Sequence, residues 1–179
     1  MPTDRSLHDD SVWLIDTPRQ RIRRIEPGDG AAMLAVYGDA DAMRWVGDGR
    51  PLDAAQCEEW IGVTLRNYAT RGYGMVALVE RTTGEVIGFC GLVHPGGQPD
   101  AEIKYALRRD HWGRGLATEA ATALLAWGAS ALGLRQVMAT AAPENVASHR
   151  VLLKAGMRRG ALRHNADGSR TQLFSWPAA

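Results

Sequence analysis

The sequence is poor in cysteine and has no excess of either charge. Of its 179 residues only two are cysteines, Cys57 and Cys90, and no histidine or cysteine lies at metal-ligand spacing from them. We therefore expect no zinc site and no disulfide framework. The 21 lysines and arginines nearly balance the 20 aspartates and glutamates, for a net charge of +1. The basic excess of proteins that bind phosphate backbones is missing, so nucleic acid is not an expected partner.

A long apolar run is also missing. The longest one, residues 120–131, is interrupted by polar residues such as Thr122 and Ser130 and is shorter than the ~20 residues that span a bilayer. The N-terminal residues include Asp4 and Asp9 and lack the charged and then apolar pattern of a secretion signal. We expect a cytoplasmic protein with no membrane partner.

The length and composition fit one folded domain. At ~150 residues per domain, a chain of 179 residues leaves room for one domain and a short appendage. A hydrophobic content of 45% supplies the side chains for its core. We expect residues 1–11 to be a loose N-terminal segment and residues 12–179 to form a single domain.

Hydrophobic periodicity and turn residues divide the chain into strands and helices. Strands are predicted at residues 12–15, 19–25, 73–80, 86–93, 101–107, 136–141, 157–163 and 171–176. Helices are predicted at residues 54–68, 116–132 and 146–155, with two short helices within 29–45, where Gly38 and Asp39 break the pattern. Helices between early and late strands, with hairpins in the middle and at the end, predict an α/β fold in which helices flank a mixed sheet.

The run from Ala101 to Ala120 carries the clearest functional signal. It is typical of a strand, a turn containing Gly113 and Gly115, and the start of a helix. Glycines let successive peptide N–H groups converge, and the first helical turn adds unpaired N–H groups and the positive end of the helix dipole. Such a turn can bind a pyrophosphate, although a plain tight turn has the same composition. Neither a G-x-G-x-x-G fingerprint nor a P-loop lysine occurs there, which argues against the two commonest nucleotide folds.

Two motifs resemble the GCN5-related N-acetyltransferase (GNAT) family, in particular its RimJ/RimL-type branch of ribosomal-protein alanine acetyltransferases. Residues 112–120, W-G-R-G-L-A-T-E-A, resemble the acetyl-CoA loop and helix start of that branch. Residues 145–157, N-V-A-S-H-R-V-L-L-K-A-G-M, resemble its second motif, with Asn, Ser, Lys and Gly at the same spacings. The resemblance covers nearly the whole chain beyond its N-terminal segment.

The resemblance implies an acyl-CoA N-acyltransferase fold with a splayed, mostly antiparallel sheet. It places acetyl-CoA, as acyl donor and without a metal, between the strand that ends at Leu107 and the strand 136–141. The coenzyme-binding residues that it implies are Leu107, Trp112, Gly113, Arg114, Gly115, Leu116, Ala117, Thr118 and Asn145. Main-chain groups near Leu107 would hold the pantetheine arm, and amides from Gly113 to Thr118 would hold the pyrophosphate. The family favours Gln or Arg where Trp112 stands, which leaves the backbone amides as the expected contacts.

Glu102 is the candidate general base. Acetyl transfer needs a neutral amine, and an α-amine with a pKa near ~7.7 demands a weaker base than a lysine with a pKa near ~10.4. Glu102 is the only carboxylate of the strand 101–107, and the resemblance implies a base at this position, acting directly or through water. In a regular strand its side chain points with Lys104 and Ala106. A charge pair with Lys104 is therefore the alternative.

Ser148 and Asn145 are the candidates in the second motif. The resemblance implies that Ser148 protonates the departing thiolate and that Asn145 contacts the coenzyme. Capping of the helix start is the alternative for both residues. Many relatives have a tyrosine acid seven residues after this asparagine, but here that position is Leu152, so tyrosine is missing from its usual place.

The other polar and aromatic candidates are expected to be structural. We expect the histidines without partners at triad or metal spacing to lie on the surface, namely His94, His111, His149 and His164. We expect the tryptophans Trp45, Trp60 and Trp127 to be core residues rather than substrate platforms. Trp45 nevertheless borders a glycine-rich loop where the family binds its acceptor, and it is the candidate substrate contact.

These observations predict an acetyl-CoA-dependent N-acetyltransferase in which a primary amine attacks the thioester directly within a ternary complex. The acceptor is a protein N-terminal α-amine or a small-molecule amine. The alternative is a non-catalytic acyl-CoA-binding module of the same fold that acts in sensing, and a purely structural domain is the third hypothesis. A homodimer could form through exposed edge strands. The physiological acceptor and the acyl-chain preference stay open at this point.

Overall fold

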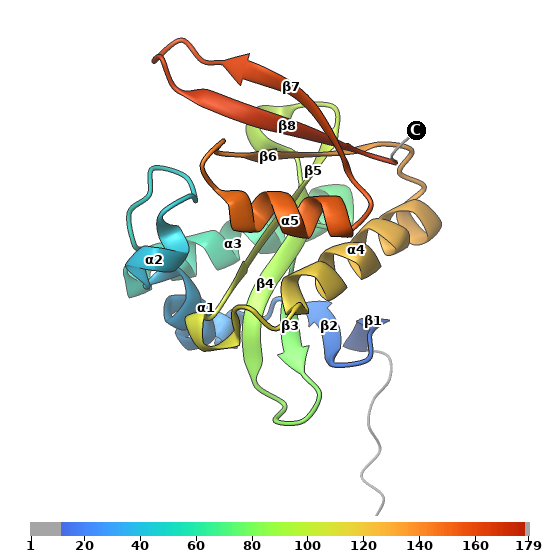
Figure 1. Ribbon diagram of the computed structural model, residues 1–179. Helices are drawn as coiled ribbons and strands as arrows, with labels where there is room; N and C mark the ends of the chain where they lie inside the picture. The colour runs from blue at the N-terminus through green and yellow to red at the C-terminus, as the bar shows by residue number, and fades with distance from the viewer. Residues whose placement is uncertain (1–11, 178–179) are drawn as a thin grey trace, which may run out of the picture.

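The computed structural model describes residues 12–177, which form one eight-stranded sheet with helices on both faces (Figure 1). The strands are β1 (Trp13–Asp16), β2 (Gln20–Arg24), β3 (Met75–Glu80), β4 (Val86–Val93), β5 (Ala101–Leu107), β6 (Val137–Ala141), β7 (Arg158–His164) and β8 (Arg170–Trp176). The helices are α1 (Gly30–Tyr37), α2 (Ala40–Met43), α3 (Ala54–Arg71), α4 (Leu116–Leu132) and α5 (Val146–Lys154). The predicted loose segment 1–11 lies outside the described residues.

The sheet is mixed and splayed at one position. Its strands lie in the order β1-β2-β3-β4-β5-β6-β8-β7, and neighbours are antiparallel except for β5 and β6, which are parallel. Those two strands pair at Ala101 with Val137 and at Glu102 with Met138. Within residues 12–177, the rest of β5 has no strand partner on this side. The predicted mixed, mostly antiparallel sheet with flanking helices is confirmed.

Helices on the two faces build two separate cores. Leu124 of α4 and Leu152 of α5 belong to the first cluster of buried apolar residues. Met33 of α1 and Ile61 of α3 belong to the second. Figure 1 shows α4 and α5 together on one face of the sheet. The sheet therefore separates an apolar core beside α4 and α5 from another beside α1 and α3.

Strand β5 contributes to both layers because its side chains alternate. Ile103 and Leu107 pack in the first cluster, whereas Ala106 packs in the second. Glu102 and Lys104 share the direction of Ala106 by the same alternation. The splayed strand thus presents apolar side chains on the side of α4 and α5, and the charged side chains of Glu102 and Lys104 on the other side.

Helix α3 shows how local sequence sets the element boundaries. The Asp53 carboxylate accepts from the Gln56 amide N–H and the Gln56 side chain accepts from the Asp53 N–H, which makes a capping box. The helix ends at Gly72, whose φ of +82° is readily adopted by glycine. The predicted start at residue 54 is confirmed, whereas the helix continues to Arg71, beyond the predicted end at residue 68.

Two histidines predicted to be exposed are buried. His111 follows β5 and is 6% exposed, with Nδ1 2.8 Å from the Asp110 carboxylate. His149 is 5% exposed, and its Nε2 lies 3.0 Å from the carbonyl oxygen of Ala142. The prediction is wrong for both because tertiary packing buries each ring, and a nearby oxygen, of Asp110 or of Ala142, satisfies one ring nitrogen. His164 is exposed, as predicted, and His94 is half-buried.

Two tryptophans predicted to be core residues are exposed. Trp45 is 45% exposed in the loop after α2, and Trp60 is 37% exposed on α3. Trp127 is partly buried against the first cluster. The prediction is wrong for Trp45 and Trp60 because both residues line a cavity instead of packing in the core.

Membrane and metal features are absent from the part of the chain that the structure describes. No helix of residues 12–177 combines the length and the apolar character that crossing a bilayer requires. Within the same residues, no group of three or more histidine, cysteine or acidic side chains is placed to hold a metal ion. Cys57 and Cys90 are free and buried.

Candidate active site

A cavity of about 1470 Å³ opens where β5 and β6 separate. Its walls include Ile103–Leu107 of β5, Ala139–Ala141 of β6, the start of α4 and one face of α5. Most of the predicted site residues line it, namely Trp45, Leu107, Trp112, Gly113, Gly115, Leu116, Ala117, Thr118, Asn145 and Ser148. Glu102 and Arg114 lie outside this lining. The fold thus gathers residues from two distant motifs around one cleft.

The turn before α4 leaves its backbone open to a ligand. Gly113 and Gly115 have φ of +72° and +76°, in the left-handed region that glycine adopts readily. A Cβ atom at Gly113 would meet no atom within 4 Å. No side-chain hydrogen bond caps the start of α4, so its first N–H groups can bind an anion. The residues present therefore fit the pyrophosphate that the resemblance implies.

The turn between β1 and β2 holds this loop from behind. The Glu119 carboxylate of α4 accepts from the Thr17 hydroxyl at 2.7 Å, from the Arg19 amide at 2.8 Å and from the Arg19 guanidinium at 2.7 Å. The same guanidinium donates to the Arg114 carbonyl oxygen at 2.7 Å. Burial opposes ionisation of Glu119, but these hydrogen bonds outweigh it and hold its pKa below the usual value. Glu119 therefore fixes the loop as an ionised group.

Glu119→Gln is expected to destabilise the fold by about 1–3 kcal/mol at pH 7, because charge-assisted hydrogen bonds of a partly buried carboxylate are lost. The folded-state pKa of Glu119 is depressed, so its stabilising effect is complete above the ordinary glutamate pKa of ~4.3 and is lost as the pH falls through the folded-state value. Thermal unfolding followed by circular dichroism at pH 7 and at lower pH checks this. Glu144→Gln, in an exposed pair with Arg170, is the control with little effect. Equal stabilities of wild type and Glu119→Gln would contradict the prediction.

Arg114 points its side chain away from the cavity. Its guanidinium lies 3.4 Å from the Glu80 carboxylate, beneath the loop and next to His111, whose Nε2 is 3.6 Å from Glu80. Burial raises the pKa of Glu80, whereas Thr83, His111 and Arg114 lower it, and the net pKa is below the usual value. Any ligand contact of Arg114 is therefore left to its main chain.

Trp112 anchors the loop to the end of β5. Its indole Nε1–H donates to the Leu107 carbonyl oxygen at 2.8 Å, and its ring is 46% exposed. The tryptophan that stands in place of the family's Gln or Arg thus connects the glycine turn to the strand. One lone pair of the Leu107 carbonyl is used in this contact.

Glu102 is paired and deeply buried. The residue is 3% exposed, and its Oε1 accepts from the Lys104 ammonium and from the Thr140 hydroxyl. Its Oε2 accepts no hydrogen bond from the residues that the structure describes. Lys104 and Thr140 line the cavity, whereas Glu102 lies behind them. The charge pair with Lys104 is formed, and Oε2 is the atom left to bind a water molecule or a proton.

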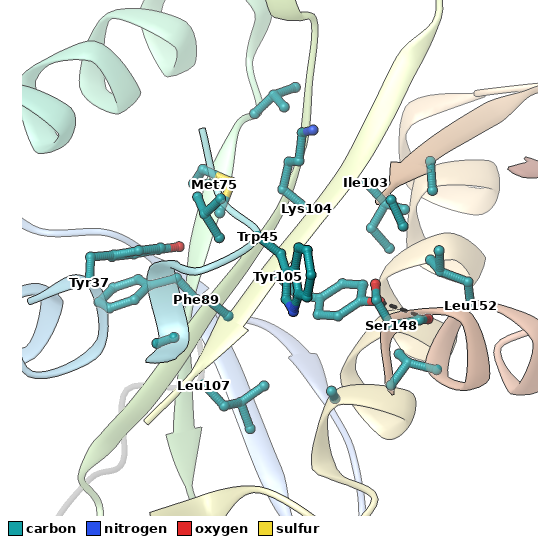
Figure 2. A pocket seen from close by; sticks show the side chains of 18 of the residues that line it. Tyr37, Trp45, Met75, Phe89, Ile103, Lys104, Tyr105, Leu107, Ser148 and Leu152 are labelled. Carbon is teal, nitrogen blue, oxygen red and sulfur yellow. Dashed lines mark hydrogen bonds between the residues drawn. The ribbon is translucent and has the colours of Figure 1, made fainter. Parts of the chain in front are cut away.

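Tyr105 and Ser148 meet across the cleft. Their hydroxyl oxygens are 2.6 Å apart, and the tyrosine hydroxyl is also 3.2 Å from the Ser148 carbonyl oxygen (Figure 2). Burial raises the pKa of Tyr105 to about 12. A tyrosine therefore does stand in the site, on β5 rather than on α5. Sequence reasoning missed it because only the expected α5 position was considered, although the alternation of β5 already places Tyr105 with Ile103 and Leu107.

Asn145 caps α5 and lines the cavity. Its side-chain oxygen accepts from the Ser148 amide at 3.2 Å, which is the capping contact weighed against a ligand contact. Its side-chain amide group donates no hydrogen bond within residues 12–177. The two roles are therefore compatible.

Tyr73 and His94 form a second polar pair in the cavity wall. The Tyr73 hydroxyl is 2.6 Å from His94 Nε2, and His94 Nδ1 is 2.9 Å from the Gln98 carbonyl oxygen. A carbonyl can only accept, so Nδ1 carries the proton and Nε2 accepts from the tyrosine. Sequence reasoning placed His94 on the surface because its partners come from the segment between α3 and β3 and from the following turn.

Comparison with known proteins gives a consistent result. The family model described as "Acetyltransferase (GNAT) domain" matches residues 19–158. The uncharacterized protein YkkB of Bacillus subtilis (strain 168) is 36% identical over 146 residues, which cover 79% of this chain and 83% of YkkB.

Two solved structures share the fold. A GNAT-family acetyltransferase from Bacillus anthracis superposes with a TM-score of 0.79 at 23% identity, covering 90% of this chain and 96% of that one. The ribosomal L7/L12 α-N-protein acetyltransferase RimL, solved in complex with coenzyme A, gives a TM-score of 0.77 at 16% identity, covering 91% and 96%. At sequence identities of 23% and 16%, these two structures show a shared fold and nothing more. With the family model spanning most of the sequence, the chain belongs to the GNAT acetyltransferase family.

Proposed function

We propose that the protein transfers an acetyl group from acetyl-CoA to a primary amine. The observation that carries this proposal is one continuous cleft. It runs from the uncapped start of α4, along the unpaired edge of β5, to the hydroxyls of Tyr105 and Ser148. These features support an anion site at one end of the cleft and a proton donor at the other, with room for an extended chain between them.

The donor is held mainly by main-chain groups. The amides of Gly113 to Thr118 bind the pyrophosphate, and the unpaired edge of β5 near Leu107 binds the amides of the pantetheine arm as a strand partner would. Asn145 offers its free side-chain amide from α5. RimL was solved with coenzyme A bound, which supports the same ligand class here.

The transfer needs two proton movements. The neutral amine nitrogen attacks the thioester carbonyl carbon, and the carbon–sulfur bond breaks. The proton of the attacking amine passes to Glu102 Oε2, directly or through a water molecule, and the departing thiolate takes a proton from Ser148. The products are the N-acetylated amine and coenzyme A. Glu102 then releases its proton to solvent and Ser148 regains one from solvent, so atoms and charges balance over the cycle.

Tyr105 supports the proton donor. With its pKa raised to about 12, Tyr105 is protonated throughout the physiological range, and its hydroxyl can donate a hydrogen bond that stabilises the Ser148 oxygen after Ser148 has given up its proton. Its ring packs against the first cluster, which fixes the hydroxyl in place. The pair therefore supplies the acid that many relatives supply with a tyrosine on the helix.

Ser148→Ala is expected to lower kcat by about threefold, and Ser148→Ala with Tyr105→Phe by about tenfold or more, because general acids contribute substantially to transfer and the tyrosine remains in the single variant. Steady-state thiol release measures kcat, and calorimetry checks that coenzyme A still binds. A double variant with the turnover of wild type would show that neither hydroxyl donates the proton.

The finer assignment follows the resemblance. We propose that residues 12–179 form one catalytic domain and that it is related to the RimJ/RimL-type branch, one member of which acetylates a ribosomal protein α-amine by its name. The acceptor is then an α-amine of a protein or of a small molecule, since such amines need only a weak base.

Thiol release from acetyl-CoA in the presence of an amine and peptide panel tests the proposal. Release with at least one acceptor is expected, together with saturable binding of coenzyme A. Binding without release for any acceptor would favour the second candidate, a non-catalytic acyl-CoA-binding module. An absence of binding would overturn both.

A further inference from the structure

The cavity continues from the donor cleft to the side of β5 that faces α1 and α3. We call the part of the cavity lined by Tyr37, Trp45, Trp60, Met75, Phe89 and Lys104 the acceptor compartment. Figure 2 shows Tyr37, Phe89 and Met75 on one side of β5, with Ser148 and Leu152 on the other. An acceptor that enters on this side approaches the strand opposite to the donor.

Aromatic rings dominate the walls of the acceptor compartment. Tyr37 stacks on Phe89 with ring centroids 5.9 Å apart and contacts Trp60 at 5.2 Å. Tyr37 and Phe89 are buried, whereas Trp45 and Trp60 keep large exposed ring surfaces. Exposed tryptophans beside a concave surface favour a planar apolar group. The compartment thus has the chemistry to bind an aromatic ring.

The charge that the compartment presents is positive. The side chain of Lys104 is 43% exposed and that of Glu102 behind it is 4% exposed. An ammonium has three N–H donors, of which one is taken by Glu102 and another is 3.5 Å from Thr140. At least one donor is therefore free to receive an anionic group.

Acidic groups that could attract a polycation are scarce here. Among the described residues that line the cavity, Asp41 is the only aspartate or glutamate. Its carboxylate is engaged by Arg44 at 3.1 Å and by Arg109 at 2.8 Å. Polyamines and other polycations would find no unpaired carboxylate, so their binding is disfavoured.

We propose that the acceptor is an aromatic α-amino acid, bound through its ring to the tryptophans Trp45 and Trp60 and through its carboxylate to Lys104. This inference rests on the proposed acetyl transfer and names its substrate class. In an α-amino acid the carboxylate is one carbon from the amine, so a carboxylate on Lys104 holds the amine beside β5, near Glu102 and facing the thioester. A peptide N-terminus has an amide in place of that carboxylate and cannot form the ion pair.

The test compares ligands on the unaltered protein saturated with coenzyme A. Quenching of tryptophan fluorescence measures the binding of L-phenylalanine, L-phenylalaninamide, phenethylamine, L-alanine and spermidine. L-phenylalanine is expected to bind roughly tenfold or more tightly than L-phenylalaninamide, because the amide loses the charge-assisted contact. It is expected to exceed L-alanine by a similar factor, because alanine loses the ring contact. Thiol release from acetyl-CoA is expected to follow the same order.

Two pairs of variants assign the contacts. Lys104→Met is expected to abolish the preference for L-phenylalanine over its amide, and Lys104→Arg to retain it because the charge remains. Trp45→Ala is expected to reduce the preference for L-phenylalanine over L-alanine, and Trp45→Phe to retain most of it. Circular dichroism melting identifies any variant that does not fold, and the ligand comparison on the unaltered protein does not depend on the variants.

The outcomes separate this inference from the proposed function. Selective binding of L-phenylalanine without thiol release for any amine would support the acceptor compartment and overturn acetyl transfer. Thiol release with the amide, a peptide or spermidine at rates equal to or above that with L-phenylalanine would support the transfer and overturn the aromatic amino acid. Failure of L-phenylalanine to bind in the presence of coenzyme A would also overturn it.

Discussion

Glu102→Gln is expected to lower kcat for acetyl transfer roughly tenfold to a hundredfold, because the amide cannot take the proton of the attacking amine. Glutamine has nearly the same shape and keeps an oxygen that can accept from Lys104 and Thr140. The packing of this buried position is therefore preserved while its basicity is lost. Thiol release measured over a range of pH, with the preferred amine at saturation, gives kcat and its pH dependence.

One further variant, Lys104→Met, distinguishes a general base at Glu102 from a carboxylate that only holds Lys104. If Glu102 served only to hold Lys104, then Glu102→Gln and Lys104→Met would have similar effects, confined to KM for the acceptor. A base gives a different result, since kcat falls in Glu102→Gln and the fall is largest at low pH. Near-normal turnover of Glu102→Gln at every pH would discard the role of Glu102 as base.

Gly115→Ala is expected to weaken coenzyme A binding roughly tenfold to a hundredfold. A residue with a Cβ in the left-handed region pays about 1–2 kcal/mol, and relief of this strain turns the peptide N–H groups at the start of α4 away from the anion. The new Cβ would also lie 3.4 Å from the Arg19 guanidinium that supports the loop. Isothermal titration with coenzyme A measures the loss of affinity.

Gly133→Ala is the matched control. Gly133 ends the same helix with a φ of +66°, a Cβ there would meet no atom within 4 Å, and the residue does not line the cavity. The Gly133→Ala variant is expected to lose about as much thermal stability as Gly115→Ala but to bind coenzyme A as tightly as the unaltered protein does. Equal affinities of Gly115→Ala and Gly133→Ala would show that the turn does not hold the pyrophosphate.

Much of the fold is predictable because its signals are local. Helix α4 has the predicted bounds, Leu116–Leu132, since Gly115 and Gly133 stand at its two ends. Strand β5 also has its predicted bounds, Ala101–Leu107. A break at Gly38 separates α1 from α2 as expected. Periodicity, caps and glycines act over a few residues, so one sequence is enough to place them.

The details of the site depend on contacts between distant segments. Tyr105 and Ser148 are 43 residues apart in the chain. Neither segment by itself indicates which helix lies over β5. The burial of His149 and the exposure of Trp45 have the same origin, because packing and not residue type decides them. The motifs did locate the cleft, since the glycine turn and the start of α5 both line it.

The brief pairing of β5 with β6 separates two kinds of recognition. No strand of the described part of the chain pairs with this edge of β5 beyond Glu102, so the proposed donor is bound by peptide groups that every residue type provides. The proposed acceptor is bound by side chains on the opposite side of the same strand. Substitutions that remodel Trp45 or Lys104 therefore leave the donor's contacts in place, and such a scaffold can diversify its choice of amine while its acyl source stays constant.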